Sequence, residues 1–440
     1  MPDRSSATVP GVGDRPERDL WGELEWRGAV HQTTDAGLGE KLAAERFTGY
    51  VGIDATADSL HVGHLVGVVG LQRLQQAGHR PIALLGGATT LIGDPSFKAS
   101  ERPLLSHQQI HENIAGIARQ LERFVDFGAE RALLLNNADW LAAFPVTDFL
   151  RDVGKHFTVN SMITKEAVRA RLEEREQGIS FTEFSYILLQ AYDFLHLFTS
   201  HGCRLQLGGS DQWGNITAGV DLIRRVHHAE AFGLTWPLIT KADGTKFGKT
   251  ESGTVWLDPA RTSPYQFFQF WVRADDRDVG RYLRLLTHLP RERISELDAA
   301  VQERPEQREA QRVLAHEVTA AVHGRGEADA AARTAQALYA GDLRSLDEAA
   351  LLDVFAEAPS SRLPRQALGS DGPSLVELVA QTGLAPSRSA ARTGIEQGGV
   401  YVNDRRELDP QRRMGEEDLL AGAYVVLRKG KRSYHLVRFG

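Results

Sequence analysis

A strand, a turn and a helix follow one another in residues 50–77, and a second apolar strand comes directly after them. The alternating run at 50–54 predicts the first strand, and apolar residues recur at helical spacing from Leu60 to Leu74. Residues 81–85 predict the second strand. We therefore expect an α/β fold with a doubly wound, Rossmann-like parallel sheet, in which ligands bind at the carboxyl ends of the strands.

Two histidines stand at the start of this helix, in the sequence HVGH. His61 and His64 are three residues apart and share one helix face, and Gly63 between them allows a ligand to approach the backbone. The N-terminus of a helix offers unpaired N–H groups and a partial positive charge, which suit a phosphate. The alternatives are a zinc pair or two ordinary surface histidines. Zinc would need further ligands, and the chain has one cysteine and no HExxH sequence.

A second phosphate-binding candidate is the segment KFGKT at residues 246–250. Lys246 and Lys249 are three residues apart beside a glycine, an arrangement that can clamp a polyphosphate, and Thr250 adds a hydroxyl. Transfer at phosphorus needs aligned reactants and hydrogen-bond donors aimed at the charge that develops on the phosphates. Both histidines and both lysines are donors of this kind.

A polar stripe lies on a predicted apolar helix. Tyr186, Gln190 and Asp193 follow one another at intervals of four and three residues, so they share one helix face. Burying these three side chains without partners would be costly, and a ligand with an ammonium group and a hydroxyl would satisfy them. A helix that turns this face to water is the alternative interpretation.

Taken together, these motifs resemble those of the bacterial tyrosyl-tRNA synthetases, a family of class I aminoacyl-tRNA synthetases. HVGH and KFGKT resemble the HIGH and KMSKS motifs of that class, in the same order and at a similar separation. The likeness covers about residues 20–440 and includes YVGIDATADSLHVGHL, GGATTLIGDPS, FTEFSYILLQAYDF and GGSDQWGNITAG. It implies an ATP-dependent tyrosine–tRNA ligase, which forms tyrosyl-adenylate and transfers tyrosine to the terminal adenosine of tRNA.

By this resemblance, Tyr50 and Asp193 bracket the phenol hydroxyl of tyrosine, and Asp94, Tyr186 and Gln190 receive its ammonium group. Such a site rejects phenylalanine because its polar groups would be left unpaired, a rule for which tyrosyl-tRNA synthetases are themselves the standard example. The other implied residues form three groups: Asn137 and Gln212 in the tyrosine pocket; Gly52, Asp54, Gly209 and Asp211 around the nucleoside of ATP; Thr56, His61, His64, Lys246, Lys249 and Thr250 at the phosphates.

Lys98 and Arg102 lie in a polar stretch of the sequence. As flexible cations near a phosphate site, they could close over it during the reaction. By resemblance they match a mobile basic loop that holds pyrophosphate in the transition state. Phe97 and Ala99 depart from the pattern of the family, which has a glycine and often a second basic residue there.

Composition separates the end of the chain from the rest. The net charge is −7, but residues 373–440 hold eleven Lys and Arg against eight Asp and Glu, so they carry +3 and the remainder carries −10. A basic end is a candidate phosphate-backbone surface, although a solvated face gives the same count. It resembles a small ribosomal RNA-binding fold, and its candidate tRNA contacts are Arg388, Arg392, Arg405 and Arg406.

The expected domains follow from these patterns. We expect a disordered tail at 1–19, then the catalytic domain at 20–260 with a helical dimerisation insertion near 120–190. A helical tRNA-binding domain at 261–345, a linker at 346–372 and a small basic α+β RNA-binding domain at 373–440 complete the chain.

The resemblance further implies a homodimer, with Mg²⁺ carried by ATP and no metal held by the protein. The single cysteine, Cys203, and the polar N-terminal tail favour a cytoplasmic protein with no membrane anchor. Two alternatives remain. A tryptophanyl enzyme would share the ATP motifs, but an indole has no hydroxyl for Tyr50 and Asp193. An RNA-binding scaffold without the chemistry would not need HVGH and KFGKT.

Overall fold

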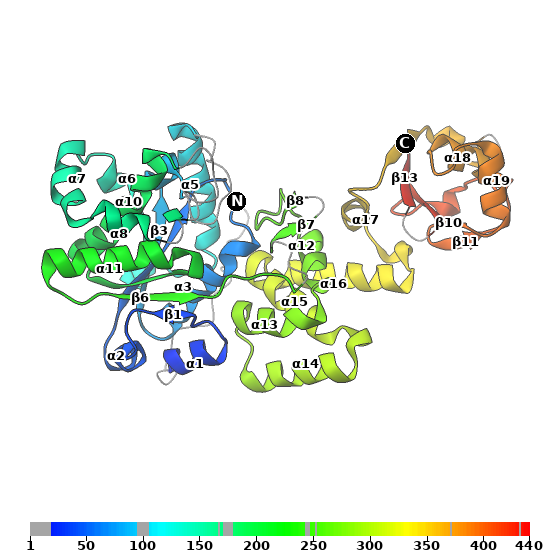
Figure 1. The fold of residues 1–440 in the computed structure, drawn as a ribbon. Helices are drawn as coiled ribbons and strands as arrows, with labels where there is room; N and C mark the ends of the chain where they lie inside the picture. The colour runs from blue at the N-terminus through cyan, green and yellow to red at the C-terminus, as the bar shows by residue number, and fades with distance from the viewer. Residues whose placement is uncertain are drawn as a thin grey trace. The chain divides into compact units, whose positions relative to one another are not determined.

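The computed structural model describes residues 19–94, 105–165, 168–169, 179–242, 247–250, 253–369, 372–430 and 433–440. Figure 1 shows the fold coloured by residue number, and the chain divides into two compact units. Unit 1 comprises Met1–Arg261 and Ala274–Ala310, and unit 2 comprises Thr262–Arg273 and Gln311–Gly440. In the described part of the chain, no helix combines the length and the apolar character that a membrane span requires. Residues 1–18 of the tail expected at the N-terminus lie outside the described residues.

Unit 1 is built on a six-stranded sheet with the order β1-β6-β5-β2-β3-β4. Neighbouring strands from β6 to β4 are parallel, which confirms the doubly wound sheet, whereas β1 is an antiparallel edge strand. The strand order runs outward in opposite directions from β2 and β5, and the crevice between their carboxyl ends is where such sheets bind ligands. The strands are β1 (Gln32–Thr33), β2 (Thr48–Asp54), β3 (Arg80–Gly86), β4 (Leu133–Asn136), β5 (Cys203–Gly209) and β6 (Phe232–Trp236).

Helices cover both faces of this sheet. Helix α3 packs on β2, β3 and β5, while α10 and α11 pack on each other and on β5. A short hairpin of β7 (Lys249–Thr250) and β8 (Gly253–Thr254) follows the sheet. The helices of unit 1 are α1 (Leu20–Trp26), α2 (Leu38–Ala44), α3 (Leu65–Gln76), α4 (Thr89–Ile92), α5 (His107–Leu121), α6 (Ala138–Leu141), α7 (Val146–Asp152), α8 (Val159–Ile163), α10 (Phe181–His201), α11 (Trp213–His227), α13 (Asp276–Leu286) and α14 (Arg291–Glu303).

Two predicted helices are shorter in the structure. The sequence pattern of residues 20–32 predicts one helix, but α1 ends at Trp26, and Gly28, with a positive φ of 67°, turns the chain toward the edge strand β1. The pattern of residues 104–130 predicts one long helix, but α5 ends at Leu121, and residues 128–130 form a separate 3₁₀ turn ahead of β4. In both places the sequence pattern was longer than the hydrogen-bonded helix.

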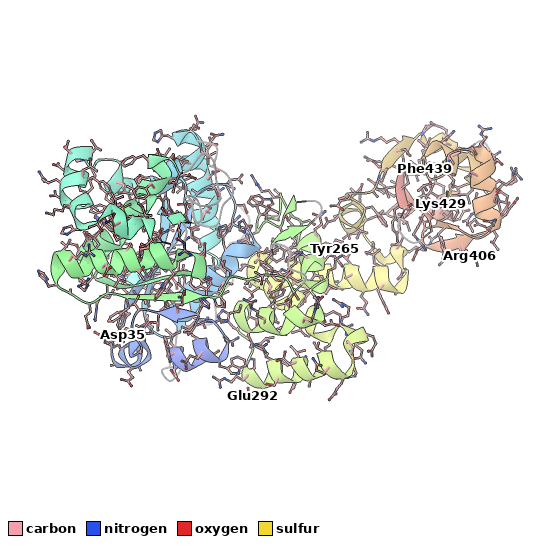
Figure 2. The ribbon with its side chains drawn as sticks, viewed as in Figure 1. Asp35, Tyr265, Glu292, Arg406, Lys429 and Phe439 are labelled. Atoms are coloured by element: carbon pink, nitrogen blue, oxygen red, sulfur yellow. The ribbon has the colours of Figure 1, made fainter. Side chains whose placement is uncertain are left out.

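Unit 2 combines helices with a five-stranded sheet of order β11-β10-β12-β13-β9. Figure 2 labels Phe439, whose buried ring lies in the core beneath α18 and α19. The helices are α12 (Pro264–Val272), α15 (Glu309–His323), which begins at the end of unit 1, α16 (Arg325–Ala340), α17 (Glu348–Val354), α18 (Leu375–Gln381) and α19 (Arg388–Glu396). The strands are β9 (Ser360–Leu363), β10 (Val400–Val402), β11 (Arg405–Glu407), β12 (Tyr424–Lys429) and β13 (Ser433–Phe439).

The segment expected as a linker, residues 346–372, contains α17 and β9. Strand β9 pairs in parallel with β13, from Ser360 opposite Leu436 to Leu363 opposite Phe439. This pairing joins residues more than 70 positions apart, so the local Pro, Ser and Gly composition of the segment did not reveal it. The terminal domain therefore takes one of its strands from the expected linker.

Candidate active site

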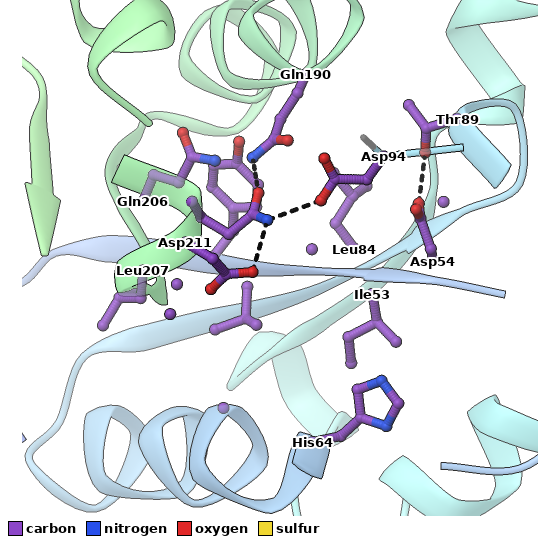
Figure 3. Close-up of a pocket in the computed structure, with 18 of the residues that line it drawn as sticks. Ile53, Asp54, His64, Leu84, Thr89, Asp94, Gln190, Gln206, Leu207 and Asp211 are labelled. Carbon is purple, nitrogen blue, oxygen red and sulfur yellow. Dashed lines mark hydrogen bonds between the residues drawn. The ribbon is translucent and has the colours of Figure 1, made fainter. Parts of the chain in front are cut away.

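A cavity of about 320 Å³ opens at the carboxyl ends of β2 and β5, the crevice that the strand order identifies. Figure 3 shows its polar lining. Fourteen of the residues expected at the substrate sites line it. They come from β2, the turn between β2 and α3, α10, the end of β5 and the segments that follow β3, β4 and β5: Tyr50, Gly52, Asp54, Thr56, His61, His64, Asp94, Asn137, Tyr186, Gln190, Asp193, Gly209, Asp211 and Gln212.

Strand β2 divides this cavity into two sides. Successive side chains of a strand point to opposite faces. Tyr50 packs with Phe194 of α10, their ring centroids 5.4 Å apart, whereas Val51 faces Gly67 of α3. Figure 3 shows His64 on the opposite side of the strand from Gln190. The cavity thus has an α10 side, which is deep, and an α3 side with the two histidines.

The deep end holds a buried carboxyl group. Asp193 accepts hydrogen bonds from Nδ2 of Asn137 at 2.9 Å and from Nε1 of Trp140 at 2.7 Å. Burial raises the pKa of Asp193 to about 7, although both hydrogen bonds oppose this rise. Burial, followed by the charge of Asp193, also raises the pKa of Tyr50. The Tyr50 hydroxyl is fully buried and has no hydrogen-bond partner among the described residues.

Above this end lies a network of amides and carboxylates. Gln212 accepts from Nε2 of Gln190 at 3.2 Å and donates to Asp94 at 2.8 Å and to Asp211 at 3.2 Å. Asn215 donates to both Gln190 and Gln212, at 2.9 and 3.1 Å. Burial raises the pKa of the Asp211 carboxyl. These bonds gather carboxylates and amide oxygens at one place, which is an acceptor site suited to a cation.

Asp54 connects the two sides of the cavity. The hydroxyl of Thr89 donates to its Oδ1 at 3.1 Å, and the Tyr186 hydroxyl lies 3.4 Å from both of its carboxylate oxygens. Asn137 donates to the same Thr89 at 3.0 Å. A chain of hydrogen bonds therefore runs from Asp193 through Asn137 and Thr89 to Asp54.

The turn before His61 is held by helix α5. Asn113 donates to the carbonyl of Ala55 at 2.8 Å, and the Gln120 amide bonds both the Leu60 N–H and the Ser59 hydroxyl, at 2.8 and 3.0 Å. Short hydrogen bonds of this kind fix where the helix that follows begins. The sequence pattern placed the histidines on a helix, and the structure puts residues 62–64 in one 3₁₀ turn that continues into α3.

Several expected residues cannot be placed in this cavity. Lys98, Arg102 and Lys246 lie outside the described residues, as do Phe97 and Ala99. The backbone of Lys249 and Thr250 forms β7. Within the described ranges there is no group of three or more His, Cys, Asp or Glu residues that could hold a metal ion. In that part of the chain, the zinc alternative for His61 and His64 finds no third ligand.

Four lining or supporting residues were not expected from the sequence: Thr89, Trp140, Gln206 and Asn215. Gln206 lies in the middle of β5, is 2% exposed, and its side-chain oxygen has no partner among the described residues. The signal in the sequence was a single amide between Leu205 and Leu207 in a buried strand, where a polar side chain needs a partner. The other three act by holding Asp54, Asp193 and Gln190, which only the fold reveals.

The basic candidates of the terminal domain are exposed on unit 2. Arg388 and Arg392 lie on α19, and Arg388 is 3.3 Å from Glu377 in an ion pair. Arg405 and Arg406 lie in β11, and Figure 2 shows Arg406 at the edge of the domain. Arg406 donates to the carbonyls of Gln397 and Gly398 at 3.0 and 2.9 Å, so it also holds the end of α19.

Comparison with known proteins covers both parts of the chain. The family described as tRNA synthetases class I (W and Y) matches residues 42–340, and the tyrosine–tRNA ligase SYY-like C-terminal domain matches residues 353–437. The tyrosine–tRNA ligase of Roseiflexus castenholzii is 55% identical over 418 residues, which cover 94% of this chain and 98% of that protein. The enzyme of Geobacillus stearothermophilus is 53% identical over 425 residues, covering 96% and 100%.

Solved structures agree. A C-terminally truncated mitochondrial tyrosyl-tRNA synthetase of Aspergillus nidulans superposes with a TM-score of 0.66 at 32% identity, covering 73% of this chain and 94% of that one. The tryptophanyl-tRNA synthetase of Plasmodium falciparum, at 15% identity and a TM-score of 0.52, covers 76% and 88% and shares the fold alone. With two family matches and near-complete coverage of its relatives, this chain belongs to the tyrosine–tRNA ligase family of class I aminoacyl-tRNA synthetases.

Proposed function

We propose that the α10 side of the cavity binds tyrosine and that the α3 side binds ATP, so that this enzyme forms tyrosyl-adenylate across the end of β2. The observation that carries the proposal is the pairing of a buried hydroxyl, Tyr50, with a buried carboxyl, Asp193, at the deep end. A phenol hydroxyl placed there would accept from Tyr50 and donate to Asp193. An indole has no hydroxyl to do either, which disfavours tryptophan.

The ammonium group of tyrosine fits the acceptors above this end. Asp94, Tyr186 and Gln190 surround that position, and Gln212 aligns Asp94 with Gln190 through its hydrogen bonds. Asn137 acts through Asp193, because its amide holds the carboxylate that accepts the hydrogen bond of the phenol. The amino acid is then fixed at both ends, with its carboxylate directed toward β2 and the ATP side.

The reaction itself needs no general base. An oxygen of the tyrosine carboxylate, already ionised, attacks the α-phosphorus of ATP; the new C–O–P bond forms as the bond to the bridging oxygen breaks, and pyrophosphate leaves with its Mg²⁺. Donors must therefore stabilise charge on the phosphates. We assign this role to Thr56, His61 and His64, and propose the same for Lys98, Arg102, Lys246, Lys249 and Thr250. Gly52, Asp54, Gly209 and Asp211 would hold the nucleoside.

The second half-reaction transfers tyrosine to the terminal adenosine of tRNA. We assign the grip on the tRNA backbone to the helices of residues 261–345 and to the basic domain at 373–440. The exposed arginines of this domain include Arg388, Arg392 and Arg405. Arg406 can contact phosphate only through guanidinium N–H groups that do not already bond the carbonyls at the end of α19. Because such contacts are electrostatic, they weaken with salt.

We also propose a cytoplasmic homodimer. Among the described residues, five of the ten large hydrophobic side chains that are exposed fall in the helical insertion, namely Val146, Leu150, Val159, Ile163 and Phe181. Exposed apolar side chains gathered in one region mark an interaction surface. Figure 1 shows α7 and α8 beside α10 on one side of unit 1, where a second copy could cover them.

Amino-acid-dependent ATP–pyrophosphate exchange tests the proposal. Tyrosine, phenylalanine and tryptophan are compared for the unmodified protein, Asp193→Asn and Asp221→Asn. Asp221 is an exposed carboxylate paired with Arg224 on α11 and serves as the matched control. We expect exchange with tyrosine only, lost in Asp193→Asn and kept in Asp221→Asn. Exchange with tryptophan, or no exchange with any of the three by folded protein, would overturn it.

A further inference from the structure

The segments that lead into and out of KFGKT are held by different neighbours. After this stretch, Val255 donates to the carbonyl of Gly248 at 3.0 Å, and Val62 donates to Val255 at 3.1 Å. Leu257 donates to Leu60 at 2.8 Å, so the chain here runs antiparallel to the HVGH segment. The exit from KFGKT is thus bonded directly to the histidine turn.

The entry to KFGKT is held by helix α13 instead. Asp278 accepts from the N–H of Ala242 at 2.8 Å, and Arg281 donates to the carbonyl of Leu238 at 2.7 Å. The ring of Tyr282 packs against Phe247, with centroids 5.2 Å apart. Arg281 and Tyr282 come three and four positions after Asp278, so both lie beside it on the helix surface. The first half of α13 therefore holds the entry to KFGKT in place.

The other end of α13 is fixed by two buried arginines, Arg27 and Arg73, which are 3% and 5% exposed. Arg73, from α3, donates to the carbonyls of Arg284 and Thr287, both at 3.0 Å. Arg27, which follows α1, donates to the same two carbonyls at 2.9 and 3.1 Å. The last carbonyls of a helix lack partners within it and carry partial negative charge, which accounts for this attraction.

Burying two guanidinium groups at one helix end costs free energy, because both charges are removed from water. Burial, followed by the charge of the neighbouring Arg27, lowers the pKa of Arg73 to about 9, although Glu23 opposes this shift. One carboxylate, Glu23, is 2.6 Å from Nε of Arg27. Apolar side chains of similar size would fill this space without the cost of removing two charges from water. What they could not do is fix the direction and position of the α13 carbonyls.

We propose that Arg73, assisted by Arg27, is a positioning residue for adenylate formation, which sets the entry to KFGKT relative to HVGH by fastening α13 to α3. Helix α3 begins immediately after His64, and α13 carries the contacts to Ala242 and Phe247. Both motifs must meet the same triphosphate, and a displacement of about 1 Å can cost about 10²-fold in rate. The inference rests on the proposed assignment of these two motifs to ATP.

Single-turnover formation of tyrosyl-adenylate tests this. Arg73→Met removes the guanidinium and keeps an unbranched apolar chain, and Arg73→Lys keeps a charged donor. For Arg73→Met we expect the rate at saturating tyrosine to fall by about 10- to 100-fold, with a higher KM for ATP and an unchanged Kd for tyrosine. Arg73→Lys recovers part of the rate. Arg27→Gln gives a smaller effect of the same kind and serves if Arg73→Met does not fold.

Arg291→Met is the matched control. Arg291 also donates to a backbone carbonyl, that of Gly22 at 3.2 Å, but it does not bond the end of α13. A second test couples the two ends of α13. If α13 positions the loop entry as one rigid helix, Asp278→Ala combined with Arg73→Met is no slower than the slower single variant, because either change frees the loop entry.

Three results would overturn the inference. A normal rate and a normal KM for ATP in Arg73→Met, even with lower stability, would show that the arginine serves the fold alone. A Kd for tyrosine that rises in step with the rate loss would indicate general damage to the pocket. Additive effects in the double variant would separate Arg73 from the loop. Failure of the proposed function is distinct, because the unmodified protein would then form no adenylate.

Discussion

The imidazole rings of His61 and His64 are stacked, with centroids 3.9 Å apart and planes inclined by 27°. Backbone N–H groups hold both rings: Gly63 donates to Nδ1 of His61, and His61 donates to Nδ1 of His64, each at 3.1 Å. An Nδ1 atom that accepts a hydrogen bond leaves the proton of a neutral His61 on Nε2. The ring is thus fixed as a donor before any phosphate arrives.

Replacing His61 by alanine should slow activation without weakening tyrosine binding. Loss of one preorganised donor at a site of developing charge costs about 10²- to 10³-fold in rate. Stopped-flow adenylate formation and equilibrium binding of tyrosine measure the two quantities separately. His111→Ala, at an exposed position on α5, is the control and should behave as the unmodified protein. Equal losses in rate and tyrosine affinity would contradict the assignment of His61 to ATP.

The affinity for tyrosine should depend on pH through Asp193, whose pKa burial raises to about 7. Below that pH the carboxyl is protonated and accepts the phenol hydrogen bond more weakly, so affinity falls as the pH drops from about 8 to about 6 and levels off above about 8. Titrations at these values check this. Asp193→Asn removes the titrating group, and its weaker binding should be flat over the same range; a matching slope in the variant refutes the prediction.

The apolar surface of the insertion should support self-association. Phe181 and Val146 are 77% and 70% exposed, and a charge at either place would have to be buried in a dimer. We expect Phe181→Glu combined with Val146→Glu to sediment as a monomer at concentrations where the unmodified protein is a dimer. Tyr339→Glu, at a 96% exposed position on α16, is the control. A monomeric unmodified protein would remove the basis of the prediction.

Close packing at Gly116 should make α5 intolerant of a methyl group. A Cβ atom there would lie 2.0 Å from the carbonyl oxygen of Asp58, in the turn that leads to His61. Gly116→Ala should therefore destabilise the protein by about 1–3 kcal/mol and slow activation. Gly70→Ala in α3 meets Trp236 at an ordinary 3.7 Å and should be neutral or stabilising by up to about 1 kcal/mol. Urea unfolding compares the two; equal midpoints would contradict this account.

The sequence predicted what is local and periodic. The βαβ unit, the strand at β5 and the helix α10 with its polar stripe all came from spacing, and resemblance supplied which polar residues would converge at the carboxyl ends. Edge strand β1 has two residues and no period, so the pattern assigned Gln32 to the preceding helix and Thr33 to a break. Nothing local marks the role of Arg73 on α3, because its partners are carbonyls more than 200 residues away. Gln206 was missed for a related reason. One amide in an apolar strand indicates that a hydrogen-bond partner is needed, but it does not identify that partner.

The parallel pairing of β9 with β13 limits how this protein can be divided. A fragment that begins at residue 373 would leave the backbone of Leu436 to Phe439 as a bare edge, beside the buried Val437 and Phe439. Exposed edges of this kind recruit strands from other molecules. The terminal domain is thus transferable between proteins only as a module that starts ahead of residue 360, and a shorter fragment would aggregate.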